Sequence, residues 1–280
     1  VLCVRRPYHL IGDESSLEFI PYLVECKREN RTGYLRGSIA TINADSRVVP
    51  LGHRHKITKK VLRRMSGVKE AMGEGSIVHI GCGSVGSKIA MHLAKAGHEP
   101  HLLIDSAVFS PHNAARHACV PPPEIPGIPK AVLLTEEIRR MRLTAEPVIE
   151  DIVEICKGQS LSVNPVRSNN RLIIESTGSI AVRDMLASLP SGRLVGRLLH
   201  AVLYGQGKIG VMAIEGPDRS PNVNDLVLRL YDECVSDPEL ASVFSDKSSV
   251  RRQEVGQGCG SQTMVMPDTR VSLFSSGMAQ

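Results

Sequence analysis

Residues 76–105 read SIVHIGCGSVGSKIAMHLAKAGHEPHLLID, and this stretch decides the fold. It begins with a short apolar run, SIVHI, which predicts a strand. Glycines follow in the spacing G-x-G-x-x-G, at Gly81, Gly83 and Gly86, and open a helix. A second apolar run, HLLID, predicts a strand that ends at Asp105. A strand–loop–helix–strand unit is typical of an α/β fold with a doubly wound, mostly parallel, Rossmann-like sheet.

The glycine loop predicts a nucleotide site. Glycines permit a tight turn and close approach of the backbone to a ligand, and the following helix offers free N–H groups to a phosphate. Asp105 lies 19 residues after Gly86, where a carboxylate can bind both ribose hydroxyls. The alternative is a loop kept only for packing. We expect nucleotide to be bound by Gly81, Gly83, Ser84, Val85, Gly86 and Asp105.

The segment after Asp105 reads SAVFSPHNAARHACVPPPEIPGIPKA and adds an N-x-x-R and a G-x-P-K. Here the sequence resembles the ThiF-like superfamily, the ubiquitin-activating enzymes and their bacterial relatives. The resemblance implies an adenylation domain that binds ATP and magnesium, in which Arg116 and Lys130 grip the triphosphate and Asn113 fixes the loop. A forked guanidinium and a compact ammonium suit phosphate oxygens and stabilise charge at the α-phosphate. The alternative is that both are ordinary surface cations.

The next predicted strand, RLIIES, departs from the pattern of these relatives. In the superfamily this strand leads into an acid–x–Thr–Asp sequence, whose last Asp helps to hold magnesium and ATP. The resemblance places Thr177 in the cofactor site, but Gly178 replaces that Asp and Ala107 replaces another common acid. Two interpretations stay open. Either Glu175 or Asp105 supplies the metal ligand, or the site binds nucleotide with diminished catalysis.

Cys259 is the candidate nucleophile. It lies in the glycine-rich stretch GQGCGS, just before a helix expected from about Met264, and a helix N-terminus favours the reactive thiolate. The segment also resembles the cysteine loop of compact, non-zinc members, which implies a thioester on Cys259. The alternative is a small loop residue, because free cysteines are usually buried and inert.

Composition limits the partners. Apolar residues make up 42% of the 280, enough for a sizeable core, and no apolar run is long enough for a membrane span. The net charge is +5, and its one cluster, HRHKITKKVLRR at His53–Arg64, is interpreted as a solvated helix face and not as a nucleic-acid site. None of the seven cysteines forms a C-x-x-C pair. We therefore expect no zinc site or disulfide framework, and a cytoplasmic protein without membrane or nucleic-acid partners.

The chain is predicted to have two parts. Residues 1–75 form a small α+β extension, with strands at Val1–Val4, Leu17–Cys26 and Tyr34–Ile42 followed by an amphipathic helix. Residues 76–280 form the ATP-binding adenylation domain. The extension is similar to the connector of bacterial fusions that join a ubiquitin-conjugating domain to an activating domain. Both ends of the chain suggest that it is part of a longer polypeptide.

These features predict ATP-dependent adenylation of the C-terminal carboxylate of a ubiquitin-like protein, followed by thioester transfer to Cys259. The resemblance also implies a homodimer. One alternative is an NAD-dependent oxidoreductase that uses the same loop and Asp105, which would leave Arg116 and Lys130 without a role. Another is a catalytically weak nucleotide-binding scaffold, which the glycine at position 178 suggests.

Overall fold

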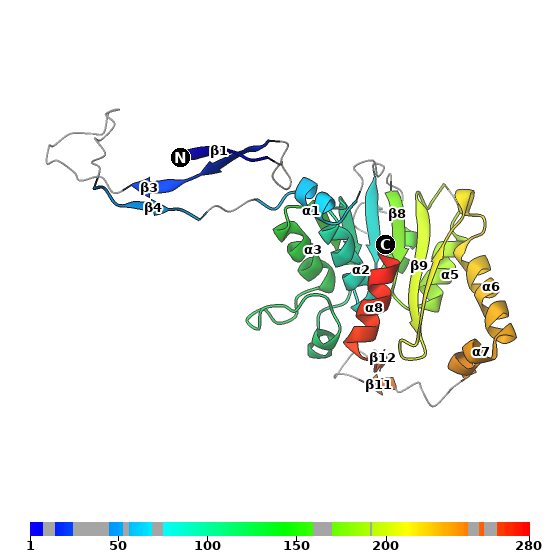
Figure 1. Cartoon of the computed structure of the whole chain (residues 1–280). Coiled ribbons are helices and arrows are strands. Elements are labelled where there is room, and N and C mark those ends of the chain that lie inside the picture. Colours follow the sequence, from blue (N-terminus) through cyan, green and yellow to red (C-terminus); the bar gives the residue numbers. More distant parts are fainter. Residues whose placement is uncertain are drawn as a thin grey trace.

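A six-stranded sheet forms the centre of the computed structural model, which describes residues 1–7, 15–24, 45–52, 56–68, 75–158, 170–190, 192–245, 252–254 and 262–280 (Figure 1). The strand order is β10-β9-β8-β5-β6-β7, and every neighbouring pair is parallel except β9 and β10. The predicted doubly wound, mostly parallel sheet is therefore confirmed. Its strands are β5 (Ser76–Ile80), β6 (His101–Ile104), β7 (Ala145–Val148), β8 (Asn170–Glu175), β9 (Arg197–Tyr204) and β10 (Ile209–Ile214).

Helices cover both faces of this sheet, because each carries a buried apolar stripe. One face packs against α2 (Ser84–Lys95), α3 (Lys130–Arg140) and α8 (Asp268–Met278). The other face packs against α4 (Ile152–Lys157), α5 (Ile180–Ser188) and α6 (Val223–Ser236), and α7 (Pro238–Ser245) packs on α6. No helix in the described ranges combines the length and the apolar character that a bilayer crossing requires.

Two boundaries differ from the sequence-based prediction. The sequence pattern predicts a strand near Pro147–Ile152, but β7 ends at Val148, because Asp151 caps α4 by accepting a hydrogen bond from the Val153 amide at 2.8 Å. The last helix begins at Asp268 and not near Met264, because Pro267 provides the extended residue that precedes it. The intervening residues include a short strand, β12 (Gln262–Met264), which pairs with β11 (Arg252–Glu254).

The described part of the first 50 residues forms two antiparallel strand pairs, which project away from the sheet in Figure 1. The strand expected at Val1–Val4 is confirmed, whereas Leu17–Cys26 contains two strands separated by Pro21. The strand expected at Tyr34–Ile42 lies outside the described residues. The pairs are β1 (Leu2–Arg5) with β2 (Leu17–Ile20), and β3 (Tyr22–Val24) with β4 (Val48–Pro50).

A short helix, α1 (Lys59–Met65), joins these strands to the sheet layers and packs against the C-terminal end of α2. Arg63 Nε donates to the Gly97 carbonyl at 3.1 Å, and Ser66 Oγ donates to the Lys95 carbonyl at 3.3 Å. Lys59 forms an ion pair with Glu99. The extension is thus attached at the end of the sheet that is formed by the N-termini of the parallel strands.

Candidate active site

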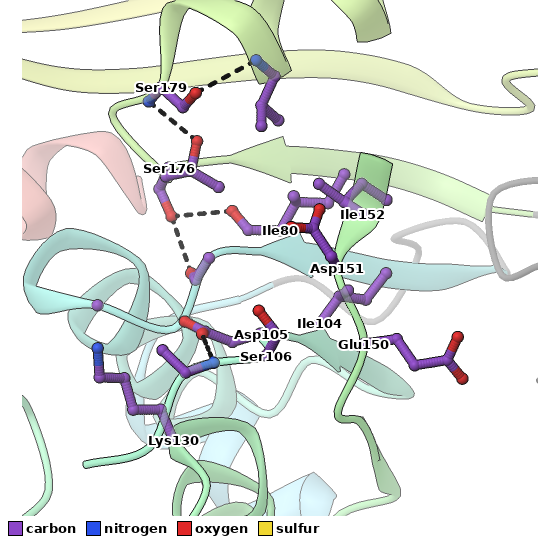
Figure 2. Close-up of a pocket in the computed structure, with 15 residues that line it drawn as sticks. Ile80, Ile104, Asp105, Ser106, Lys130, Glu150, Asp151, Ile152, Ser176 and Ser179 are labelled. Carbon is purple, nitrogen blue, oxygen red and sulfur yellow. Dashed lines mark hydrogen bonds between the residues drawn. The ribbon is translucent and has the colours of Figure 1, made fainter. Parts of the chain in front are cut away.

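Successive strands are added to the sheet on one side of β5 as far as β7, and then on its other side from β8, so the strand order reverses between the parallel neighbours β5 and β8. Ligands of open α/β sheets bind at such a switch point, outside the carboxyl ends of the strands. A cavity of about 400 Å³, here called the first cavity, lies at this place (Figure 2). It is lined by Ile80, Gly81, Gly83, Ile104, Asp105, Ser106, Ala107, Lys130, Glu150, Asp151, Ile152, Ser176, Thr177, Ser179 and Val182.

The three glycines of the loop have different reasons to be glycine. Gly81 has φ +93°, and a Cβ there would lie 3.0 Å from the Thr177 backbone nitrogen. A Cβ at Gly86 would overlap the Gly81 carbonyl oxygen. Gly83 has ordinary φ, and nothing in the described structure lies within 4 Å of a Cβ built on it. The fold therefore requires Gly81 and Gly86, whereas the open space at Gly83 suits the close approach of a ligand to the N-terminus of α2.

Asp105 and Lys130 both line the first cavity (Figure 2). The Asp105 carboxylate accepts hydrogen bonds from the Cys82 and Ala107 amides, both at 2.7 Å. These bonds fix its orientation, and each oxygen keeps a lone pair for a further donor. Lys130 is the first residue of α3, and its amide donates to the Ala107 carbonyl at 3.0 Å. A carboxylate and an ammonium group thus lie at one wall of the cavity.

Arg116 lines a second cavity of about 330 Å³. This second cavity shares three lining residues with the first: Gly83, Ser176 and Thr177. Ser84, Val85 and Gly178 also line it, and its remaining wall is apolar, formed by Ala201, Val202, Leu203, Met266 and Val271. The two predicted cations therefore lie in adjoining cavities, on either side of a common wall.

Asn113 and Gly86 line neither cavity. Asn113 belongs to a short 3₁₀ helix, η1 (Pro111–Ala115), and its Oδ1 accepts a hydrogen bond from the Ser110 amide at 2.9 Å. Its carbonyl also accepts from the amides of Arg116 and His117. Asn113 thus determines the local shape of the segment that carries Arg116.

The two histidines beside Asn113 differ in their surroundings. His117 is buried and contacts the Cys82 carbonyl through Nε2 at 2.9 Å, which connects its segment to the glycine loop. Burial lowers the pKa of His117, although the Cys119 and Cys82 carbonyls partly offset this effect. Partial burial and then the positive charges of Lys130 and Arg116 lower the pKa of His112. In both histidines the lowered pKa favours the neutral imidazole.

The residues after β8 form a turn, Ser176–Ser179, which we call the wall turn because it lines both cavities. The Ser176 hydroxyl donates to the Gly81 carbonyl at 3.0 Å, which joins the wall turn to the glycine loop. Glu175 is fully buried and lines neither cavity. Its Oε1 accepts from the Thr177 amide at 2.7 Å and from the Thr177 hydroxyl at 2.5 Å. This geometry favours a structural carboxylate over a metal ligand at Glu175.

Three carboxylates line the first cavity: Asp105, Glu150 and Asp151. Glu150 and Asp151 fall within the strand predicted near Pro147–Ile152, but they follow the end of β7, where the carboxyl ends of neighbouring parallel strands meet. Figure 2 shows Glu150 and Lys130 at opposite sides of the cavity. Over the described ranges, no three His, Cys, Asp or Glu side chains are grouped closely enough to hold a metal ion. Magnesium commonly uses only one or two carboxylates together with substrate phosphates, so this donor set still fits that ion.

Cys259 lies outside the described residues. The helix expected from about Met264 begins at Asp268, nine residues after Cys259 in the sequence, and activation of this thiol by the helix N-terminus stays a prediction. Burial raises the pKa of the thiols of Cys82, Cys119 and Cys156, to about 11 for Cys119. Burial thus disfavours the thiolate, the nucleophilic form, in these three cysteines.

A model of the ThiF family matches residues 61–233, which is more than half of the chain. The match extends from α1 into α6 and includes the glycine loop, the wall turn and all six strands of the sheet. No match was found among curated proteins.

Several solved structures are similar to the chain in fold. E. coli MccB with AMPCPP and MccA is 12% identical with a TM-score of 0.49, and the match covers 74% of this chain and 54% of MccB. E. coli TcdA, a tRNA N6-threonylcarbamoyladenosine dehydratase in complex with AMP, is 17% identical with a TM-score of 0.43, over 74% of this chain and 82% of TcdA. PaaA is 14% identical with a TM-score of 0.45, and the match covers 74% of this chain and 62% of PaaA. The chain thus matches about half the length of MccB.

Proposed function

The chain belongs to the ThiF family, and from this premise we propose that it uses ATP to adenylate the C-terminal carboxylate of a protein or peptide. The observation that carries the proposal is the common wall of the two cavities. Gly83, Ser176 and Thr177 line both, with Lys130 on one side and Arg116 on the other. Adenylation requires two substrates to meet at one phosphorus atom, and adjoining cavities with a shared wall suit that requirement.

In this proposal the first cavity takes the nucleoside part of ATP. The carboxylate of Asp105, already oriented by two backbone amides, accepts hydrogen bonds from the ribose hydroxyls. The triphosphate lies over the open space at Gly83 and receives the N–H groups of the first turn of α2. Lys130 and Arg116 then contact it from the two sides.

The reaction is an in-line displacement. An oxygen of the substrate carboxylate attacks the α-phosphorus, the bond from that phosphorus to the bridging oxygen breaks, and pyrophosphate leaves. The cations at positions 116 and 130 stabilise the negative charge that develops on the phosphoryl oxygens. A magnesium ion bound with ATP would supply further charge neutralisation, and Asp105, Glu150 and Asp151 are the carboxylates available to it.

Later steps of the proposal concern parts of the molecule outside the described residues. The Cys259 thiolate attacks the acyl carbon of the adenylate, an S–C bond forms, and AMP leaves. The substrate would be a ubiquitin-like protein, and a ubiquitin-conjugating domain would receive the acyl group. We also propose, from the family resemblance alone, that the protein acts as a cytoplasmic homodimer.

One observation favours a second function, a nucleotide-binding scaffold with weak catalysis. Gly178 has φ +71°, and the space beside it is open in the described structure, so the wall turn presents no acidic side chain at this position. In the scaffold the chain would bind ATP without transferring AMP. Binding and release of pyrophosphate must therefore be measured separately.

The test of nucleotide binding is thermal unfolding with Mg–ATP, AMP, NAD and NADP, for the wild type and Lys130→Ala. A ligand at 100 times its Kd stabilises the folded state by about 2.7 kcal/mol. We expect Mg–ATP to raise the Tm of the wild type and to raise that of Lys130→Ala less. The matched control is Lys157→Ala, which removes a surface lysine paired with Glu154 and lining neither cavity.

Stabilisation by NAD and not by ATP would contradict the proposal and favour the oxidoreductase. An equal ATP shift in Lys130→Ala and in the wild type would remove Lys130 from the site. Incubation of the wild type with Mg–ATP and candidate ubiquitin-like proteins, followed by measurement of pyrophosphate, distinguishes the enzyme from the scaffold.

A further inference from the structure

Glu175 is the last residue of β8 and is 0% exposed. Burying a carboxylate in this way is costly unless its oxygens are hydrogen-bonded. Both oxygens have partners, because Oε1 accepts from the Thr177 amide and hydroxyl and Oε2 contacts Nδ1 of His200. The carboxylate is thus fully bonded on the protein side of the wall turn.

His200 lies on β9, and the parallel register of β8 and β9 places it directly beside Glu175. Two residues earlier in each strand, Ile173 and Leu198 pack in the same cluster with the helices of one face, so Glu175 and His200 also point to that face. His200 is buried, and its Nε2 has no hydrogen-bond partner within the described part of the chain. Its polar contact there is the one with Glu175.

The contacts continue from Glu175 to both cavities. Thr177 lines both, and its hydroxyl, which donates to Glu175, also accepts from the Ser179 amide at 3.1 Å. On the other side of the wall turn, Ser176 bonds to the Gly81 carbonyl. Two sets of contacts therefore hold the common wall: the hydrogen bonds of Thr177 to the buried carboxylate, and the bond from Ser176 to the glycine loop.

We propose that Glu175 and His200 are positioning residues: they hold the wall turn against the glycine loop and so set the alignment of the two substrates that meet there. This inference rests on the proposed function. The alternative is a pair that stabilises the fold alone. The two differ in one respect, because a positioning pair affects ligand affinity in molecules that remain folded.

The chain offers a matched control in a second buried glutamate, Glu215, which is also 0% exposed. Its carboxylate pairs with Arg219 and accepts from the Val223 amide, in the connection from β10 to α6 that contains η3 (Pro217–Arg219). Glu215, Arg219 and Val223 line neither cavity. Removal of Glu215 therefore tests the effect of losing a buried carboxylate without disturbing the common wall.

The experiment compares Glu175→Ala, Glu175→Gln and Glu215→Ala, measuring unfolding in urea and, on the folded protein, the affinity for Mg–ATP by calorimetry. We expect Glu175→Ala to lower the affinity by about tenfold or more, equivalent to about 1.4 kcal/mol. Glu175→Gln should restore most of the affinity, because the amide oxygen can accept from Thr177 and the amide nitrogen can donate to His200. Glu215→Ala should unfold at lower urea concentration than the wild type and should bind Mg–ATP with the wild-type affinity.

If Glu175→Ala does not fold, His200→Phe provides the same test, since it removes the contact to Oε2 and retains a buried ring. Wild-type affinity in the folded Glu175→Ala or His200→Phe protein would overturn the positioning role. An equal loss of affinity in Glu215→Ala would overturn it too, because the effect would then follow from stability alone. Absence of Mg–ATP binding by the wild type would instead overturn the proposed function, and the inference with it.

Discussion

The glycine loop and the wall turn line both cavities, but they hold their shapes in different ways. In the loop, the backbone conformation of Gly81 and the close approach at Gly86 leave no room for a side chain. In the wall turn, the Thr177 amide donates to the buried carboxylate of Glu175 and the Ser176 hydroxyl donates to the Gly81 carbonyl, and these bonds hold the backbone. Steric exclusion therefore determines the shape of the glycine loop, whereas buried polar contacts determine the shape of the wall turn. The glycines that answer the first constraint lie within six consecutive residues, although the groups that crowd them include Ser176 and Thr177 after β8. The second constraint joins side chains of two strands, Glu175 of β8 and His200 of β9.

The largest effect is expected for Gly86→Ala. The added methyl group would overlap the Gly81 carbonyl oxygen and approach Ser176 Oγ, so loop and turn could not both keep their positions. Overpacking of this kind costs about 1–3 kcal/mol, which urea unfolding would measure. Gly277→Ala in α8 is the control, because its Cβ meets nothing within 4 Å in the described structure and alanine favours a helix by up to about 1 kcal/mol. Wild-type stability in Gly86→Ala would show that sterics do not shape the loop.

Gly83→Ala should separate binding from stability. Because the space at this residue is open and its φ is ordinary, we expect a change in unfolding free energy within about 0.5 kcal/mol. The methyl group would occupy the space proposed for the phosphates, so the affinity for Mg–ATP should fall by about tenfold or more, as measured by calorimetry. Unchanged affinity would place the phosphates elsewhere, and a large loss of stability would mean that Gly83 is needed by the fold.

The smallest effect is expected for Gly178→Asp, which introduces a carboxylate into the wall turn. A left-handed conformation costs a non-glycine residue about 1–2 kcal/mol, and Asp and Asn tolerate it best. The comparison is therefore with Gly178→Asn, which has similar strain and no charge. In titrations with Mg²⁺ at fixed ATP, we expect the Asp variant to need about threefold less magnesium than the Asn variant. Equal requirements would show that position 178 does not contact the metal.

The sequence predicted the features that depend on local pattern. The apolar runs around the glycine loop predicted β5 and β6, and the fold that follows from them, because alternation of strand and helix is itself a sequence pattern. Asp105 and Lys130 were expected in the nucleotide site, and the structure brings both to the first cavity. Their roles in binding remain predictions.

Other features depend on which strands become neighbours, and that information is not local. The contact between Glu175 and His200 exists because β8 and β9 are adjacent and in register. The second cavity unites Arg116 with Ala201 and Met266, which are far apart along the chain. Glu150 and Asp151 depend on a local feature, because the capping bond of Asp151 ends β7 early and places both acids after the strand.

The contact that joins the wall turn to the glycine loop also bears on the order in which the molecule folds. Ser176 and Gly81 are 95 residues apart, whereas the β5–α2–β6 unit lies within 29 consecutive residues, Ser76–Ile104. Closing a long loop costs more chain entropy than closing a short one, so local units form sooner. The common wall exists only after β8 has docked on β5, late in refolding. A nucleotide that needs this wall cannot assist the early steps, and its binding would mark the completion of the sheet.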